Sequence, residues 1–157
     1  LLVETPEAVD NINSILSLEG INEVHVGLND LSLAYNKKFM FELLCDGTVE
    51  KLCDIFKRVN NISYGFGGIA SPGKGVLPAE RIIAEHYRLG SSCVILSRSF
   101  CNVAQIDAVD EIKKIFASGV AEIRAFEQRC KDDYDFLQVN KIETAKIISD
   151  IVSSKFN

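Results

Sequence analysis

Short apolar runs alternate along the chain with segments whose apolar residues recur at helical spacing. The apolar runs have the length of strands and lie at residues 1–4, 24–27, 62–66 and 93–96. Helical patterns separate them and follow the last one. Strands that alternate with helices in this way predict βαβ units and a parallel sheet.

The helical patterns have recognisable starts and ends. Thr5-Pro6 offers an N-cap followed by a first-turn proline, and an apolar stripe then continues to Gly20. Asp46-Gly47-Thr48 predicts that the next pattern is divided in two. These later helical patterns are expected at about residues 37–60, 78–90, 107–131 and 141–155.

Four βα units are too few for a closed barrel. A complete (β/α)8 barrel takes about 250 residues, whereas this chain has 157. A doubly wound sheet is the other fold that such units build. We predict an α/β fold of the (β/α)8 TIM-barrel type, with about four βα units in residues 1–104 and two C-terminal helices in residues 105–157. Since Met40 is the single methionine and the chain opens inside a strand, we expect it to start within a longer protein.

The composition argues against some classes of binding partner. Seventeen Lys and Arg against 22 Asp and Glu leave a net charge of −5, without the basic stripe that nucleic acid requires. No apolar run approaches the roughly 20 residues of a membrane span. The five cysteines are scattered and form no CxxC pair, which favours reduced thiols in the cytoplasm. We therefore expect a small-molecule substrate and neither nucleic acid nor membrane as a partner.

Two acidic residues stand directly after apolar strands. Glu4 follows the first strand and Asp30 the second, and functional groups of parallel α/β folds gather at such strand ends. Neighbouring strands lie roughly 5 Å apart, so both carboxylates can reach one point. Without a histidine or cysteine partner they would form an all-oxygen site suited to Mg²⁺ or Mn²⁺. The alternative is that each acid caps the helix after it.

The remaining candidates carry weaker signals. The glycine-rich loop at residues 67–75 can cradle an anion, with Lys74 as a contact, or can be a simple flexible loop. Arg98, after the last strand, can bind an anion at the same edge or form a salt bridge inside the fold. For His25 and His86 we expect packing in the core or at the surface.

Three stretches occur in a fixed order along the chain. They are E-T-P-E-A-V-D-N at residues 4–11, G-L-N-D-L-S at residues 27–32, and a helix with Ala84, Tyr87, Leu89 and Gly90 before the last strand. The first two resemble the patterns I-E-T-x-x-A-x-x-N and G-P-x-D-L-S of the HpcH/HpaI aldolase/citrate lyase family. The helix is similar to the one before that family's last barrel strand. This resemblance covers roughly residues 1–126.

The resemblance implies a fold, a reaction and roles for residues. The chain would be the C-terminal half of a (β/α)8 barrel, starting at the fifth strand, in a protein that forms homo-oligomers through its C-terminal helices. Glu4 and Asp30 would bind Mg²⁺ or Mn²⁺, and the turn of Gly27, Leu28, Asn29 and Asp30 would offer backbone N–H groups to a substrate carboxylate.

The implied activity is a carbon–carbon lyase of the class II aldolase type. It acts through the enolate of pyruvate or a related 2-keto acid or acyl-CoA. The arginine and histidine that assist this chemistry in the family belong to the N-terminal barrel half, which these 157 residues lack. The alternative hypothesis is a half-barrel without catalysis, which binds or assembles through its open sheet edges.

Overall fold

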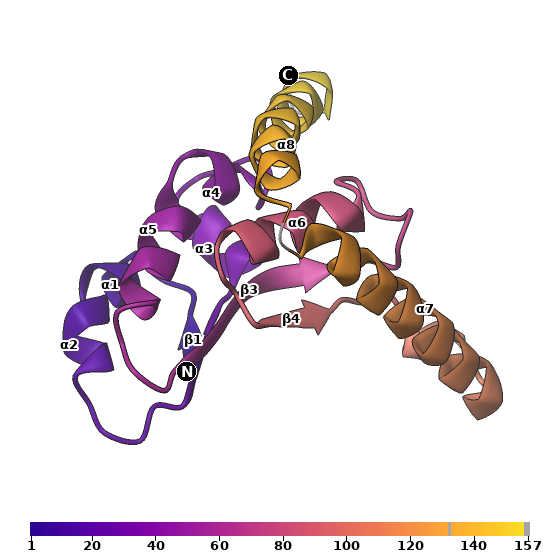
Figure 1. Cartoon of the computed structure of the whole chain (residues 1–157), viewed down its shortest axis with the longest axis horizontal. Helices are drawn as coiled ribbons and strands as arrows, with labels where there is room; N and C mark the ends of the chain where they lie inside the picture. The colour runs from indigo at the N-terminus through magenta and orange to yellow at the C-terminus, as the bar shows by residue number, and fades with distance from the viewer. Residues whose placement is uncertain (132, 156–157) are drawn as a thin grey trace.

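Four parallel strands form a single sheet, against which the helices pack (Figure 1). The computed structural model describes residues 1–131 and 133–155. The strands follow their sequence order across the sheet: β1 (Leu2–Val3), β2 (Glu23–Val26), β3 (Ser63–Ile69) and β4 (Cys93–Leu96). All three pairings are parallel. The expected α/β class and parallel sheet are confirmed, while the described residues form four strands and not an eight-stranded barrel.

Helices fill every crossover and follow the last strand. They are α1 (Pro6–Asp10) and α2 (Ile12–Leu16) after β1; α3 (Leu28–Ala34), α4 (Glu42–Cys45) and α5 (Thr48–Phe56) after β2; α6 (Ala79–Arg88) after β3; and α7 (Val109–Cys130) and α8 (Tyr134–Lys155) after β4. A short 3₁₀ turn, Val103–Gln105, precedes α7. The expected break at Gly47 is confirmed, because this residue has a φ of 85° and separates α4 from α5.

Two helical boundaries differ from the sequence-based expectation. The segment around Asn29-Asp30, expected as a polar turn, is the first turn of α3. Leu28 and Leu31 are 1% and 0% exposed, so their burial selects the helix there. Helix α8 begins at Tyr134 and not near residue 141, because the Asp133 carboxylate accepts a hydrogen bond from the Phe136 N–H at 3.0 Å and caps the extra turns.

The two faces of the sheet are covered very differently. Val3, Val26 and Phe66 lie side by side in register on the face that the helices cover, and each is 0% exposed. Leu2 and Ile95 belong to the opposite face and are 50% and 52% exposed. The helices therefore build a hydrophobic core on one side and leave apolar side chains on the other side open.

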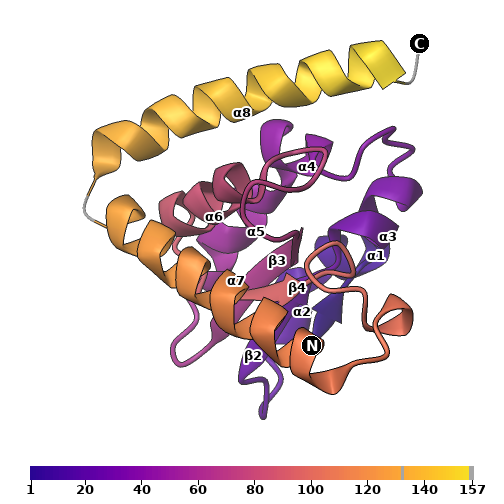
Figure 2. The same cartoon turned by 90° about the vertical axis from the view of Figure 1, so that its right-hand side faces the viewer.

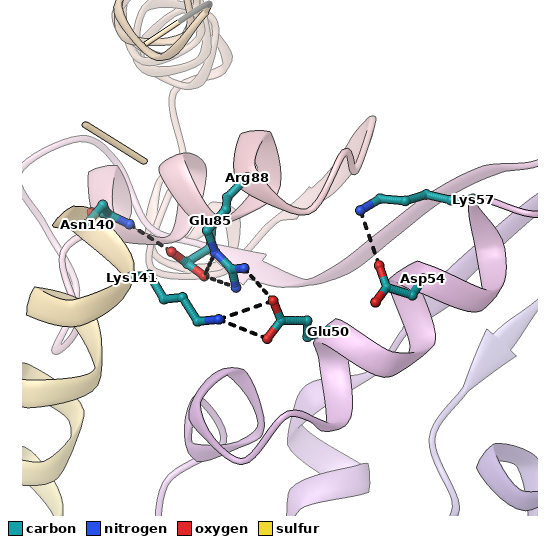
Figure 3. A network of polar contacts seen from close by, with 7 residues as sticks. All are labelled: Glu50, Asp54, Lys57, Glu85, Arg88, Asn140 and Lys141. Atoms are coloured by element: carbon teal, nitrogen blue, oxygen red, sulfur yellow. Dashed lines mark hydrogen bonds and ion pairs between the residues drawn. The ribbon is translucent and has the colours of Figure 1, made fainter. Parts of the chain in front are cut away.

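A polar network fixes α8 to the rest of the fold (Figure 3). The Arg88 guanidinium pairs with Glu85 and Glu50, both at 2.7 Å. From α8, Lys141 pairs with Glu50 at 3.1 Å, and the Asn140 amide donates to the Glu85 carboxylate at 3.1 Å. The hydrogen bond from Arg88 holds the pKa of Glu50 below its ordinary value. Helix α8 lies over α6, as Figure 2 shows.

Two further properties concern the environment of the protein. Among the described residues, no helix combines the length and the apolar character that crossing a membrane requires. All five cysteines are free thiols, with Cys53 and Cys130 buried.

Candidate functional site

A cavity of about 470 Å³ lies at the carboxyl ends of the four strands. Each strand, or the segment directly after it, contributes to the lining: Glu4 after β1, the turn from Gly27 to Asp30 after β2, Gly67 and Gly68 in β3, and Ser97 and Arg98 after β4. The structure therefore brings Glu4, Asp30 and Arg98 to one cavity, at the edge of the sheet where strand ends were expected to meet.

The position of Glu4 depends on the glycine beside it. A Cβ atom built at Gly27 would overlap the Glu4 side chain, including the carboxylate oxygen Oε1. The Glu4 carboxylate therefore occupies the space above Gly27, and any other residue at position 27 would displace it. This close approach gives a structural reason for glycine in the G-L-N-D stretch.

Asp30 enters the cavity from the first turn of α3. The Asn29 amide donates a long hydrogen bond to its carboxylate, at 3.4 Å. The first N–H groups of a helix have no intrahelical carbonyl partner, so this turn retains free donors. Gly27 is not one of them, since its N–H donates to the Val3 carbonyl at 2.9 Å. Gly27 thus contributes space for Glu4, and Leu28, Asn29 and Asp30 carry the free donors of the turn.

Neither acid is the N-cap residue of the helix after it, although Asp30 lies in the first turn of α3, where a negative charge is favourable. Thr5 caps α1, because its hydroxyl oxygen accepts a hydrogen bond from the Ala8 N–H at 3.2 Å. Within the described residues, Glu4 and Asp30 form no ion pair. Arg98 is exposed and likewise has no carboxylate partner in that part of the chain. All three charges are therefore available to a ligand.

The glycine-rich loop contributes only in part. Gly75 and the two residues after it line the cavity, whereas Lys74 is exposed and lies outside the lining. The loop is held by defined contacts: the Ser71 hydroxyl donates to the Phe100 carbonyl at 2.8 Å, and the Gly73 N–H donates to the Glu80 carboxylate at 2.7 Å. The structure thus separates Lys74 from the other candidate residues.

His25 also lines the cavity, although no sequence motif pointed to a place in the site for it. Its ring is 8% exposed and its Nε2 lies 2.8 Å from the Gly67 carbonyl oxygen. Because a carbonyl only accepts, Nε2 carries the hydrogen and Nδ1 is left as an acceptor when the ring is neutral. Alternation along a strand places His25 on the same face as Leu2 and Gly27.

His86 belongs to a different region of the fold. It is 6% exposed, stacks on Phe66 with ring centroids 3.8 Å apart, and contacts the Ser91 hydroxyl through Nδ1 at 2.7 Å. It lines a second cavity, of about 420 Å³, between α6, β4 and α7. Burial, aided by His25, lowers its pKa to about 3.

The cavity residues fit a divalent metal ion only in a limited way. No cluster of three or more histidine, cysteine, aspartate or glutamate side chains in the described part of the chain could hold one. Glu4 and Asp30 offer two carboxylates, which are hard oxygen donors and have no ion-pair partner among the described residues. Mg²⁺ is commonly bound by one or two carboxylates, with water and substrate oxygens completing its shell. The donor set therefore fits a metal ion that substrate helps to bind.

Comparison with protein-family models, with curated proteins and with solved structures finds no match for this chain. Membership of the aldolase family therefore stays a prediction that rests on the motifs around Glu4 and Asp30.

Proposed function

We propose that the cavity binds Mg²⁺ or Mn²⁺ together with a 2-oxo acid, and that the protein is a carbon–carbon lyase of the HpcH/HpaI aldolase/citrate lyase type. One observation carries this proposal. Two carboxylates, those of Glu4 and Asp30, line the same cavity at the carboxyl ends of a parallel sheet, and within residues 1–131 and 133–155 neither has a cationic partner. In this proposal, residues 1–104 are the C-terminal half of a (β/α)8 barrel.

The metal ion would be held by Glu4 and Asp30. When bound, it supplies a Lewis acid that polarises the 2-oxo group and stabilises the oxygen of an enolate. The absence of a side chain at Gly27 leaves room for the Glu4 carboxylate in this position. Because the two side chains give two negative charges and leave the rest of a metal's shell open, they favour a substrate that chelates through a carboxylate and a neighbouring carbonyl.

The substrate carboxylate would be bound by groups around the metal ligands. The free N–H groups of the first turn of α3, at Leu28, Asn29 and Asp30, are neutral donors for it. Arg98 adds a positive charge at the rim of the same cavity. We assign no role in binding to Lys74, since it lies outside the lining. We also expect the protein to work in the cytoplasm, where its five free thiols stay reduced.

Calorimetric titration with oxalate tests this proposal. Oxalate is a planar dianion that mimics the enolate of pyruvate, and we expect it to bind when Mg²⁺ or Mn²⁺ is present and not when the metal is removed by chelation. Oxalate binding of equal affinity with and without metal would contradict the proposal. A lack of oxalate binding in the presence of both Mg²⁺ and Mn²⁺ would contradict it as well.

The open sheet face favours a second candidate function, that of a non-catalytic half-barrel that assembles with a second copy. Leu2 and Ile95 are half exposed there, and within the described residues the outer edges of β1 and β4 have no strand partner. A second copy could pair its β4 with this β1 and close both edges. Sedimentation velocity should then show a dimer that Ile95→Lys dissociates, whereas a stable monomer of 17.4 kDa would contradict this candidate.

A further inference from the structure

The candidate cavity is lined by two chemically different sets of side chains. The charged set consists of Glu4, Asp30 and Arg98. The apolar set comes from two loops. It comprises Phe39, Met40 and Phe41, from the connection between α3 and α4, and Val76 and Leu77, from the segment before α6. A ligand that fills the cavity therefore meets both charged groups and hydrocarbon.

The loop that carries Phe39, Met40 and Phe41 is held by defined contacts. The Glu42 carboxylate accepts hydrogen bonds from the N–H groups of Lys38 and Phe39, both at 2.8 Å. The rings of Phe39 and Phe41 pack edge to face with centroids 5.3 Å apart. Phe41 is only 4% exposed. This part of the apolar lining is thus preorganised, which lowers the entropic cost of binding against it.

The charges of the cavity argue against a second anionic group on the ligand. Of the described residues that line it, Arg98 is the single cation, and Lys74 lies outside. A bound metal ion would be largely neutralised by Glu4 and Asp30. A second carboxylate placed against Phe39 and Met40 would exchange water for apolar side chains, and the described lining offers it no cation besides Arg98, which is unfavourable.

We infer that the substrate is a 4-hydroxy-2-oxo acid whose chain beyond C4 is an uncharged apolar group, aliphatic or aromatic, that packs against Phe39, Met40 and Val76. This inference rests on the proposed function, since the carboxylate and oxo group are placed at the metal. In the cleavage, the C4 hydroxyl gives up its proton and becomes an aldehyde carbonyl, the C3–C4 bond breaks, and its electron pair forms the enolate of pyruvate, which then takes up a proton at C3. The inference distinguishes an apolar aldehyde, as the second product of cleavage, from an aldehyde that carries its own carboxylate. The volume of the cavity, about 470 Å³, suits a compact molecule of this kind.

Oxamates test this inference, because they keep the chelating end and vary only the substituent on nitrogen. With Mg²⁺ present, we compare oxamate, N-butyloxamate and N-(3-carboxypropyl)oxamate by calorimetry. Burial of the butyl chain should raise affinity by about tenfold over oxamate. The carboxypropyl compound should bind no more tightly than oxamate itself.

Matched variants test whether the affinity gained from the butyl chain comes from contact with Met40. Met40→Gln keeps the size of the side chain but not its apolar character, so it should reduce the ratio of butyloxamate to oxamate affinity by about threefold or more. Met40→Leu should preserve that ratio. Leu33→Gln changes an exposed leucine outside the cavity lining and should leave it unchanged.

Two outcomes would overturn the inference in different ways. If oxamate binds with metal but the butyl chain adds no affinity, or the carboxypropyl chain adds more, the substrate class is wrong and the proposed function stands. If neither oxalate nor oxamate binds in Mg²⁺ or Mn²⁺, the proposed function fails and the substrate class fails with it.

Discussion

The carboxylate of Glu4 lies in the space that a side chain at Gly27 would occupy. A Cβ there would overlap both the Cγ and the Oε1 of Glu4. The two residues come from neighbouring parallel strands, since Val3 and Val26 are register partners one position earlier. The conformation of the proposed metal ligand thus depends on the absence of a side chain at the residue directly after the next strand.

This relationship predicts the effect of Gly27→Ala. The φ of Gly27 is −78°, a value that alanine adopts readily, so the main consequence should be displacement of the Glu4 carboxylate and not backbone strain. We expect Mn²⁺ affinity to fall by about tenfold or more, as measured by electron paramagnetic resonance of free Mn²⁺. Unchanged Mn²⁺ affinity in a folded variant would contradict the role given to Gly27.

The pair Arg88 and Glu85 predicts a large effect on stability. Their side chains are 7% and 2% exposed, so Arg88→Met would leave the Glu85 carboxylate buried without its cation. Breaking such a pair costs about 3–5 kcal/mol, which urea unfolding would measure. The double variant Arg88→Met/Glu85→Gln removes both charges and should recover part of the loss. A double variant less stable than the single one would argue against this account.

His86 predicts a pH dependence of stability. Its pKa in the folded protein is lowered from the ordinary 6.5 to about 3, chiefly by burial. Between these values the unfolded chain binds a proton that the folded chain does not, so stability falls as pH falls below 6.5. The contribution approaches about 1.4 kcal/mol per pH unit. His86→Phe keeps a ring against Phe66 and should flatten the pH dependence of the urea midpoint between pH 6.5 and 5. Equal slopes for the two proteins would refute this.

Much of the fold could be predicted from the sequence because its signals are local. The alternation of strands and helices gave the parallel sheet, and Gly47 gave the break between α4 and α5. Helix α3 was not predicted, because Asn29-Asp30 is typical of a polar turn and its helical state depends on the burial of Leu28 and Leu31 against the core. Burial of this kind is a property of the tertiary structure.

Some residues of the candidate site could likewise be predicted from the sequence, and others could not. Glu4 and Asp30 could be predicted to lie at one edge because the strand ends share it, and both residues do line one cavity there. Lys74 could not be placed, since the glycine-rich loop that carries it is shaped by contacts with Phe100 and Glu80. That Phe39 and Met40 line the cavity could not be predicted either, because apolar residues near a helix are most simply interpreted as core residues.

The most direct test of the central claim is a Mn²⁺ titration of the Glu4→Gln and Asp30→Asn variants beside the wild type. Glu19→Gln, which removes an exposed charge outside the cavity, is the matched control. Free Mn²⁺ is measured by electron paramagnetic resonance, with oxalate present and absent. We predict that wild type and Glu19→Gln bind Mn²⁺ and that oxalate tightens this binding, while each of the other two variants loses both effects. Wild-type Mn²⁺ and oxalate binding in Glu4→Gln and Asp30→Asn would contradict the account.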